Sequence, residues 1–419
     1  MGGEKYMKEP KLRFKADDGS DFPDWEEKKL GDIANRVTRK NKRNIADIPL
    51  TISSVDGLID QRNFFNKVVA SRDMSGYYLL KNGEFAYNKS YSKGYDFGSI
   101  KRLDLYNQGA LSTLYICFAL NENENSDFYQ KYFDSLSWYP ELQKICAEGA
   151  RNHGLLNVPT NDFFKIKLRV PKVKDEQQKI ADFLSTIDTI IEKQRATVSA
   201  WEERKKGVMQ KLFSQEVRFK ADDGSDFPDW EECTVGELFV PVVKKNKDGS
   251  IQNVITNSAQ YGLIPQRDFF DKDIAIKENT SNYTIIQNGD FVYNPRKSTT
   301  APFGPFNIYE RDEAGIVSPL YTCLTPKYKE MTPYLSWYFR TNKWHPYIVT
   351  HGAQSGARHD RVGMTATLMN GIPVIYPSLP EQQKIADCLS ALDAVIEQQK
   401  ETLEKWQELK KGLLQQMFV

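Results

Sequence analysis

Two long stretches of this chain carry the same heptad pattern of apolar residues. The first, residues 176–213, contains no proline and a single glycine, Gly207. Its seam positions alternate steps of four and three residues, which is the spacing of a coiled coil. They are Ile180, Leu184, Ile187, Ile191, Gln194, Val198, Trp201, Lys205, Val208 and Leu212. A helix of this length would extend about 57 Å, and so long a seam requires a partner helix.

Residues 381–418 supply that partner within the same chain. Each seam position recurs 205 residues later, including the polar interruptions at Gln399 and Lys410. We therefore expect the two helices to pair antiparallel, with pseudo-twofold symmetry and the globular parts at opposite ends. Gln194, Lys205, Gln399 and Lys410 are predicted to fix the register of the pair, because a polar group in a seam penalises misaligned pairings.

The repeat extends beyond the helices, so the chain is a duplicated domain rather than a solenoid. Residues 13–27 recur unchanged as 218–232, and three further islands recur at offsets of 205 or 206, whereas the segments between them differ almost completely. The further islands are 57–65, 82–88 and 109–117, with copies at 262–270, 288–294 and 315–323. The predicted domains are 1–174 and 215–379, each followed by a long helix at 175–214 or 380–419.

Each globular part is predicted to be mixed and mainly β, which makes the fold class α+β. Asn82-Gly83 and Asn288-Gly289 precede alternating apolar runs, a pattern typical of a hairpin turn. Apolar runs at 111–120 and 317–324 predict buried strands. We also expect short aromatic helices in 126–148 and 332–350 and terminal strands in 163–170 and 371–376. Asp17 to Asp21 predict an ordinary turn, because the carboxylates lack the spacing of a calcium loop.

The composition excludes some classes of protein and leaves nucleic-acid binding open. The net charge is +1, so a DNA-binding chain of this kind must segregate its charge or rely on a partner. Basic residues do cluster at 36–43 and 244–247, although a solvated loop would look the same. Five scattered cysteines without a CxxC pair favour a reducing cytoplasm and argue against a zinc site. No apolar run is long enough to span a membrane.

A duplicated frame with diverged surfaces suits a particular kind of target. Surfaces that are identical in the two halves, such as residues 13–27, would bind two copies of one partner. Surfaces that differ would contact two unlike features. Duplex DNA carrying two short words at a fixed separation is such a target, because half-site spacing mirrors protein geometry.

Several motifs together resemble the specificity (S) subunit of Type I restriction-modification systems. They are PKLRF and the DW and KKLGDIA strings within 10–34, NGEFAYN and NGDFVYN at 82–88 and 288–294, and the EQQKIAD strings that open both long helices. The resemblance covers nearly the whole chain. It implies two target recognition domains that read a bipartite, asymmetric DNA sequence whose spacer is set by the coiled coil.

The resemblance also implies how the work is divided within a complex. Two methyltransferase subunits would bind this chain, and restriction subunits would join them in the full nuclease. Adenine methylation and cleavage would belong to those partners. This chain would bind no cofactor of its own, and S-adenosylmethionine would be held by the methyltransferase subunits.

Candidate base-reading residues lie where the two halves differ and long polar side chains gather. Arginine and lysine can contact guanine, and asparagine suits adenine. Phosphate contact or a solvated loop is the alternative for each residue. The DNA-binding candidates are Lys89, Ser90, Tyr91, Lys93, Arg151, Asn152 and His153 in the first half, and Arg296, Lys297, Ser298, Arg358, His359 and Arg361 in the second.

Two other classes of function are the alternatives. A self-contained nuclease or methyltransferase would need its own active site, but the chain has no GxGxxG before a helix, no P-loop and no HExxH. Asn294-Pro295-Arg296-Lys297 lacks the second proline and the aromatic residue of an adenine methyltransferase motif. A coiled-coil adaptor would bind proteins only, without sequence-dependent affinity for DNA.

Overall fold

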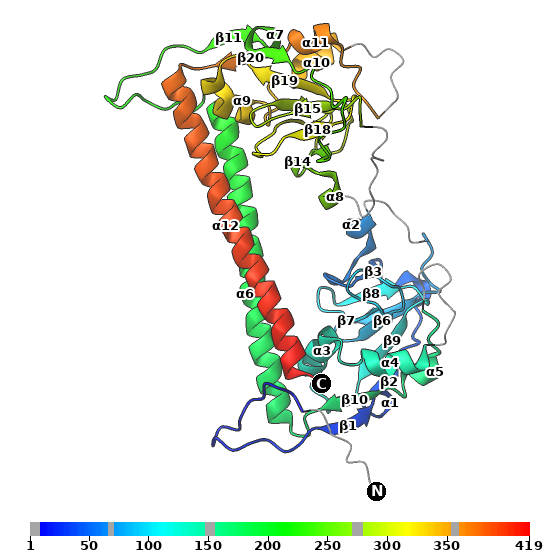
Figure 1. Cartoon of the computed structure of the whole chain (residues 1–419). Coiled ribbons are helices and arrows are strands. Elements are labelled where there is room, and N and C mark those ends of the chain that lie inside the picture. The colour runs from blue at the N-terminus through cyan, green and yellow to red at the C-terminus, as the bar shows by residue number, and fades with distance from the viewer. Residues whose placement is uncertain (1–8, 66–70, 147–155, 270–279, 353–359) are drawn as a thin grey trace. The chain divides into compact units, whose positions relative to one another are not determined.

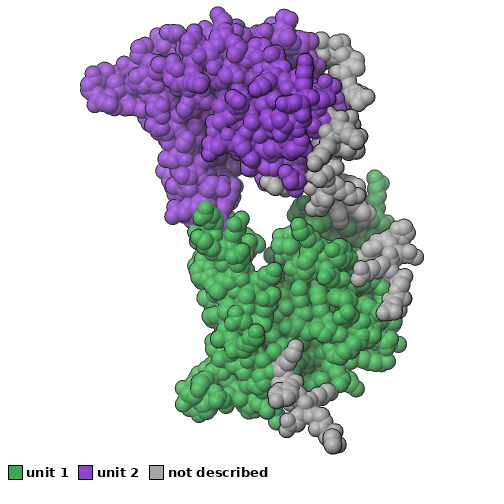
Figure 2. Space-filling view, viewed as in Figure 1, with its two compact units in different colours: residues 1–196, 401–419 green, residues 197–400 purple. Residues whose placement is uncertain are grey.

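The structure is a computed structural model of the chain, and it describes residues 9–65, 71–146, 156–269, 280–352 and 360–419. The chain forms two compact units (Figures 1 and 2). Unit 1 consists of Met1–Ala196 and Glu401–Val419, and unit 2 of Thr197–Lys400. Each unit therefore holds one globular part together with segments of both long helices. No helix in the described ranges is long and apolar enough to cross a membrane.

The two predicted long helices are confirmed as α6 (Lys174–Phe213) and α12 (Leu379–Met417). They pair antiparallel within each unit. In unit 1 the first half of α6 contacts the last half of α12, as the ion pair between Asp188 and Lys410 shows. In unit 2 the last half of α6 contacts the first half of α12 through Lys205 and Asp393.

Unit 1 contains two four-stranded sheets and one pair of strands in its described part. One sheet has the order β2-β9-β6-β7 and is antiparallel throughout. The other has the order β4-β3-β8-β5, in which β3 and β8 are parallel. The strands are β1 (Glu26–Lys29), β2 (Ala34–Arg36), β3 (Pro49–Ser53), β4 (Gly57–Asp60), β5 (Tyr78–Lys81), β6 (Phe85–Asn88), β7 (Ser99–Arg102), β8 (Gln108–Leu111), β9 (Ile116–Leu120) and β10 (Lys167–Val170).

Unit 2 repeats this plan, with strands that are as long as their counterparts or one residue shorter. Its four-stranded sheet has the order β12-β19-β16-β17, and β13-β14 and β15-β18 form separate pairs that a single parallel bridge between Val254 and Ile316 connects. The strands are β11 (Glu231–Thr234), β12 (Phe239–Pro241), β13 (Ile255–Ser258), β14 (Gly262–Pro265), β15 (Thr284–Ile286), β16 (Phe291–Tyr293), β17 (Phe306–Ile308), β18 (Gly315–Val317), β19 (Thr322–Pro326) and β20 (Pro373–Tyr376).

The predicted aromatic helices are present, and each prediction corresponds to a pair of helices. In unit 1 the break between α3 and α4 contains Leu136, whose φ of 65° cannot continue a right-handed helix. The predicted terminal strands are β10 and β20, which pair with β1 and β11. The short helices are α1 (Leu30–Ile33), η1 (Lys42–Asn44), α2 (Gln61–Phe65), α3 (Ser126–Ser135), α4 (Tyr139–Ile145), α5 (Thr160–Phe163), α7 (Val235–Leu238), α8 (Gln266–Phe269), η3 (Lys329–Met331), α9 (Thr332–Tyr338), α10 (His345–His351) and α11 (Ala366–Asn370). Together with the sheets they confirm the α+β fold class.

The prediction of hairpin turns at the two Asn-Gly pairs is wrong. Asn82-Gly83 connects β5 to β6, which lie in different sheets, and Asn288-Gly289 connects β15 to β16 in the same way. The Asn82 amide donates to the carbonyl oxygens of Asp104 and Tyr106, at 3.1 Å each. These tertiary bonds hold the turn at a corner between sheets, which the local dipeptide pattern cannot distinguish from a hairpin.

The single strands predicted at 111–120 and 317–324 are also wrong in detail. Each run is divided between two strands of different sheets, β8 and β9 in unit 1 and β18 and β19 in unit 2. A turn divides each run, closed by hydrogen bonds from Tyr115 N to Ser112 O and from Tyr321 N to Ser318 O. The turns contain Ser112 and Thr113 in unit 1 and Ser318 and Pro319 in unit 2, which interrupt the otherwise largely apolar runs.

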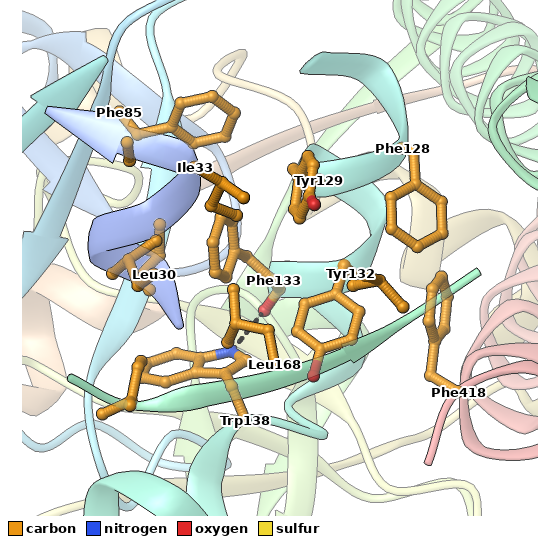
Figure 3. Packing of buried hydrophobic residues seen from close by; sticks show 14 of the residues in the cluster. Leu30, Ile33, Phe85, Phe128, Tyr129, Tyr132, Phe133, Trp138, Leu168 and Phe418 are labelled. Carbon is orange, nitrogen blue, oxygen red and sulfur yellow. Dashed lines mark hydrogen bonds between the residues drawn. The ribbon is translucent and has the colours of Figure 1, made fainter. Parts of the chain in front are cut away.

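An aromatic cluster forms the main core of unit 1 (Figure 3). Helix α3 contributes Phe128, Tyr129, Tyr132 and Phe133, all buried. Phe418, just beyond the end of α12, packs against two of them, with ring centroids 5.8 Å from Phe128 and 5.6 Å from Tyr132. The end of the second long helix is therefore part of the core of the first globular domain.

The core of unit 2 contains the equivalent contact. Phe213, at the end of α6 and 205 residues before Phe418, is buried with its ring centroid 5.6 Å from Tyr334 and 6.1 Å from Tyr338. Each long helix thus ends with a phenylalanine buried in the domain from which the other long helix begins. The same contact therefore occurs in both units with the roles of the two helices exchanged.

Candidate nucleic-acid interface

A nine-residue loop follows the shared Tyr-Asn pair in each unit. We call residues 89–97 the first variable loop and residues 295–303 the second variable loop. Both begin with the same bond, in which the asparagine side chain accepts a backbone N–H two residues later: Ser90 N to Asn88 Oδ1 at 2.9 Å, and Arg296 N to Asn294 Oδ1 at 3.0 Å. Both loops therefore begin with the same local turn.

The two loops also close in the same way. The hydroxyl of Tyr87 donates to Phe97 O at 2.8 Å, and that of Tyr293 donates to Phe303 O at 2.7 Å. The next residue is glycine in both cases, with φ of 77° at Gly98. A Cβ on Gly98 would lie 2.0 Å from the Asn88 carbonyl oxygen, so only glycine permits this closure.

Between these identical ends the contents differ. The first variable loop reads KSYSKGYDF and the second PRKSTTAPF, and at equivalent positions they share only Ser92 with Ser298 and Phe97 with Phe303. Loops of the same length and with the same ends thus present two different sets of side chains. That arrangement suits two different recognition sequences read by one geometry.

The candidates in the first variable loop are accessible to different degrees. Tyr91 is 59% exposed and Lys93 is also exposed, whereas Lys89 and Ser90 are half-buried. Burial lowers the pKa of Lys89 below its usual value. Tyr91 and Lys93 are therefore the residues of this loop best placed to reach a nucleic acid.

The second variable loop borders a polar groove in unit 2. Arg296, Lys297 and Ser298 are exposed, and they line the groove together with Asn257, Gln266 and Tyr283. Its volume is about 490 Å³. Amide, hydroxyl and cationic groups converge there, which is the mixture of donors and acceptors that base edges require.

The structure brings together the two clusters of candidates that the sequence placed far apart. Lys297 N donates to Asp360 O at 2.8 Å, and Arg296 forms a backbone bridge with Arg361. In unit 1, Leu156 N donates to Lys89 O at 2.9 Å, so the chain returns to the first variable loop as well. Arg151, Asn152, His153, Arg358 and His359 lie outside the described residues.

Arg361 is held close to the second variable loop but retains unused donor capacity. Its side chain is 27% exposed, with Nε 3.7 Å from an oxygen of Asp360. Nε is buried and has no hydrogen-bond partner. Arg361, Pro295 and Thr322 line a second open pocket of about 460 Å³.

Part of the first basic cluster is used to hold the fold. Arg39 donates to both oxygens of Glu84, at 2.9 and 2.8 Å, and Lys40 donates to Gly76 O at 2.9 Å. Arg36, Lys42 and Arg43 are exposed. These three residues are the ones available to phosphate groups.

The predicted register lysines each form an ion pair between the two long helices. Lys205 Nζ lies 2.5 Å from Asp393 Oδ1, and Lys410 Nζ lies 2.6 Å from Asp188 Oδ1. Asp393 follows Asp188 by 205 residues, as Lys410 follows Lys205. The same pair therefore occurs in both units with the roles of the helices exchanged. Gln194 and Gln399 are half-buried.

Two side chains with catalytic potential, Asn294 and His345, are packed into the framework of unit 2. Asn294, the first residue of the methyltransferase-like string, is buried and donates to Asn257 O at 3.0 Å. His345 packs 4.9 Å from the Phe303 ring, and burial lowers its pKa. Within the described ranges, no group of three or more His, Cys, Asp or Glu residues is arranged to hold a metal ion.

Two features of the site were not predicted, although both recur at the repeat distance in the sequence. The Phe-Gly pairs that close the variable loops, at 97–98 and 303–304, are separated by the same 206 residues as the Tyr-Asn pairs. The aspartates that form ion pairs with the register lysines are also separated by 205 residues. Asp188 and Asp393 lie outside the heptad seam, so the seam pattern alone did not select them.

Comparison with known proteins identifies the family. The model of the Type I restriction modification DNA specificity domain matches twice, at residues 23–198 and 228–405. A putative Type I restriction enzyme specificity subunit from Methanocaldococcus jannaschii is 23% identical, and the match covers 96% of this chain and 94% of that protein.

Two solved structures share the fold. A chain from a study of complex assembly and conformational transition of the Type I restriction-modification system matches with a TM-score of 0.54 and 17% identity, over 94% of this chain and 98% of that chain. The S subunit from M. genitalium matches with a TM-score of 0.51 and 14% identity, over 98% and 99% of the two chains. With two family matches on two α+β units, this chain belongs to the Type I restriction-modification DNA specificity family, as a non-catalytic specificity subunit with two recognition domains.

Proposed function

We propose that the first and second variable loops read the two different half-sites of a bipartite, asymmetric DNA sequence. The observation that carries this proposal is the identical frame of the two loops, from the asparagine cap to the closing glycine, around different contents. Helices α6 and α12 set the number of base pairs between the half-sites. The matched ion pairs of Lys205 and Lys410 support this, because they define one register for the helix pair.

The same proposal includes the partners of the chain. A specificity subunit acts with DNA and with the other subunits of its complex. We propose two methyltransferase subunits, one for each copy of the duplicated frame, and restriction subunits in the full complex. S-adenosylmethionine is held by the methyltransferase subunits and not by this chain. A cytoplasmic location belongs to the proposal, and the free cysteines at 117, 146, 233, 323 and 388 support it.

Replacing Arg296 and Lys297 by alanine is expected to change recognition of one half-site only. Loss of a direct base contact costs about 1–3 kcal/mol, or about 5- to 150-fold in affinity. The methylated motif should become degenerate at one or more positions of one word, while the other word and the spacer stay unchanged. Sequencing of methylated bases in DNA from cells that carry the variant and its methyltransferase subunit measures this.

The matched variant in the other unit is Lys93→Ala combined with Tyr91→Ala. This variant should make recognition of the other half-site less specific. If both pairs of substitutions weakened methylation of every site uniformly, the loops would contact phosphates rather than bases, and their role as readers would be wrong.

The alternative functions predict different outcomes in direct assays. A self-contained enzyme would methylate or cleave DNA when the purified chain is incubated with DNA, S-adenosylmethionine and magnesium. We expect no turnover by the chain alone. A coiled-coil adaptor would show no preference for its motif in competition binding at a fixed salt concentration, whereas we expect the complex with methyltransferase subunits to prefer it.

A further inference from the structure

Each unit carries one surface patch, and the two patches are formed by the same two stretches of sequence. In unit 1 it consists of residues 13–27 and the first turns of α6, residues 176–182; in unit 2 it consists of residues 218–232 and residues 381–387 of α12. The second stretch reads EQQKIAD in both helices. We call these surfaces the duplicated patches. Two separate identical stretches thus meet in space in each unit.

The same contacts hold the two stretches together in both units. The guanidinium of Arg13 donates to both oxygens of Glu176, at 2.9 and 3.0 Å. Arg218 and Glu381 repeat this pair at 3.1 and 2.7 Å. These carboxylates are completely buried, so the pair anchors the turn to the helix.

A lysine on each helix makes the second anchor. Lys179 Nζ donates to Asp17 Oδ1 at 2.5 Å and to Lys15 O at 2.9 Å. Lys384 makes the equivalent bonds with Asp222 and Lys220, at 2.6 and 2.8 Å. At the tip, Asp18 accepts the backbone N–H of Ser20, which is an ordinary Asx turn of the kind predicted from the sequence.

The outer residues of the patch are exposed to the same extent in both copies. Asp17 and Asp222 each have side chains that are 96% exposed, and Asp21 and Asp226 are 86% and 84% exposed. Ion pairs this exposed contribute little to folding stability. Stability alone therefore does not require these outer residues to be identical, in contrast to the buried Arg–Glu pairs.

The charge of the patch is unfavourable for binding DNA. Residues 13–27 contain six carboxylates and two basic residues. One of the basic residues, Arg13, is engaged by Glu176, and the other, Lys15, lies 3.6 Å from Asp21. A surface of this sign repels phosphate groups. An identical acidic surface presented twice suits a basic surface on a protein that binds in two copies.

We propose that each duplicated patch docks one methyltransferase subunit through a basic surface of that subunit. This inference rests on the proposed function, which supplies a partner present in two copies. It adds the surface and its chemistry. The turn at 15–24 and its copy at 220–229 are the contact, and the buried Arg–Glu pairs hold these turns at a fixed orientation on the helices.

The test uses the full chain co-purified with its methyltransferase subunit, with stoichiometry measured by native mass spectrometry. The variant D21K/D24K changes the patch of unit 1, D226K/D229K changes the patch of unit 2, and a third variant combines them. We expect two methyltransferase subunits on the wild type, one on each single-patch variant and none on the combined variant. The affinity of a reversed patch should fall at least tenfold, and D21N/D24N should show a smaller loss.

Charge-matched controls reverse two exposed carboxylates outside the patch in each unit. These are D47K/E122K in unit 1 and D312K/E330K in unit 2, and both should retain two methyltransferase subunits. Thermal unfolding of the patch variants should match that of the controls, since only exposed side chains change. Light scattering of the chain alone identifies self-association as a competing occupant of the patch.

The outcomes separate this inference from the proposal on which it depends. If the wild type binds two methyltransferase subunits and the combined variant also binds two, the docking surface is wrong and the proposed stoichiometry stands. If the wild type itself binds fewer than two, the proposed stoichiometry is wrong, and the docking inference falls with it. Self-association that the patch variants abolish would also overturn the inference.

Discussion

Replacing Phe418 with alanine is expected to destabilise unit 1 by about 3–5 kcal/mol, the usual cost of removing a fully buried aromatic side chain. Phe418 is 3% exposed, and its ring also lies 6.3 Å from Trp25. Its removal would leave a cavity beside Phe128 and Tyr132 of α3 and Trp25, which precedes β1, so two separate segments of the chain would lose a packing partner. The contact of α12 with the first domain would weaken at the same time.

Hydrogen exchange followed by mass spectrometry measures this effect in each unit separately. Exchange should accelerate in peptides from α3 and from the end of α12, with little change in peptides from α9. The matched variant Phe213→Ala should give the reverse pattern, because Phe213 packs on Tyr334 and Tyr338. Leu409→Ala, at a side chain that is 47% exposed, is the control and should have little effect. Equal exchange in both units after Phe418→Ala would contradict the assignment of this side chain to one core.

Replacing Asp188 with alanine is expected to cost about 3 kcal/mol, near the lower end of the range for breaking a buried ion pair. Asp188 binds two cations, Lys410 at 2.6 Å and Lys131 at 2.6 Å. The side chain of Lys131 is only 7% exposed, so loss of the carboxylate leaves a buried charge without this partner. The effect should therefore exceed that of an exposed ion pair.

The matched variant Asp393→Ala is expected to cost only about 1 kcal/mol. In unit 2 the position 206 residues after Lys131 is occupied by Trp337, and the second cation near Asp393 is Arg340, whose side chain is 36% exposed and 3.4 Å away. Urea unfolding followed in each unit measures the difference between the two variants. Equal losses would show that burial of Lys131 does not matter.

The pH dependence of stability provides a second test of the Asp188 pair. Burial alone would raise the pKa of Asp188, but Lys410 and Lys131 outweigh it, and the pKa is lowered below its ordinary value. A carboxyl whose pKa is lower in the folded state stabilises the fold above its unfolded pKa, and this contribution is lost as the pH falls through the folded pKa. Asp188→Asn should therefore remove part of the loss of stability seen in acid.

The long helices could be predicted from the sequence because their signal is local and repeated. Ile180, Leu184 and Ile187 recur as Ile385, Leu389 and Leu392, and the observed helices begin within two residues of the predicted positions. The strands were harder to predict. In the run 111–120 the break falls at Ser112 and Thr113, but two polar residues do not distinguish a change of sheet from a short exposed patch in one strand. The Asn82 turn is determined by partners more than 20 residues away.

The sequence predicted the candidate interface from the divergence between the halves, which points to Lys93 and Arg296. Both side chains are exposed, and their reading role stays a prediction. The approach of Arg361 to Arg296 depends on the folding of the chain between them, which no local pattern encodes. Phe418 likewise reads as the last residue of an amphipathic helix, and only tertiary packing shows that it enters the core of the other half.

The central claim is that α6 and α12 measure a distance between two independent readers. The most direct measurement is the methylated motif after one heptad is inserted in each helix, between Ala196 and Thr197 and between Lys400 and Glu401, where the two units meet along the chain. Seven residues lengthen a helix by about 10 Å, or about three base pairs of duplex DNA. We expect both words to remain unchanged and the spacer to grow by about three base pairs. A changed word, or an unchanged spacer, would contradict the account.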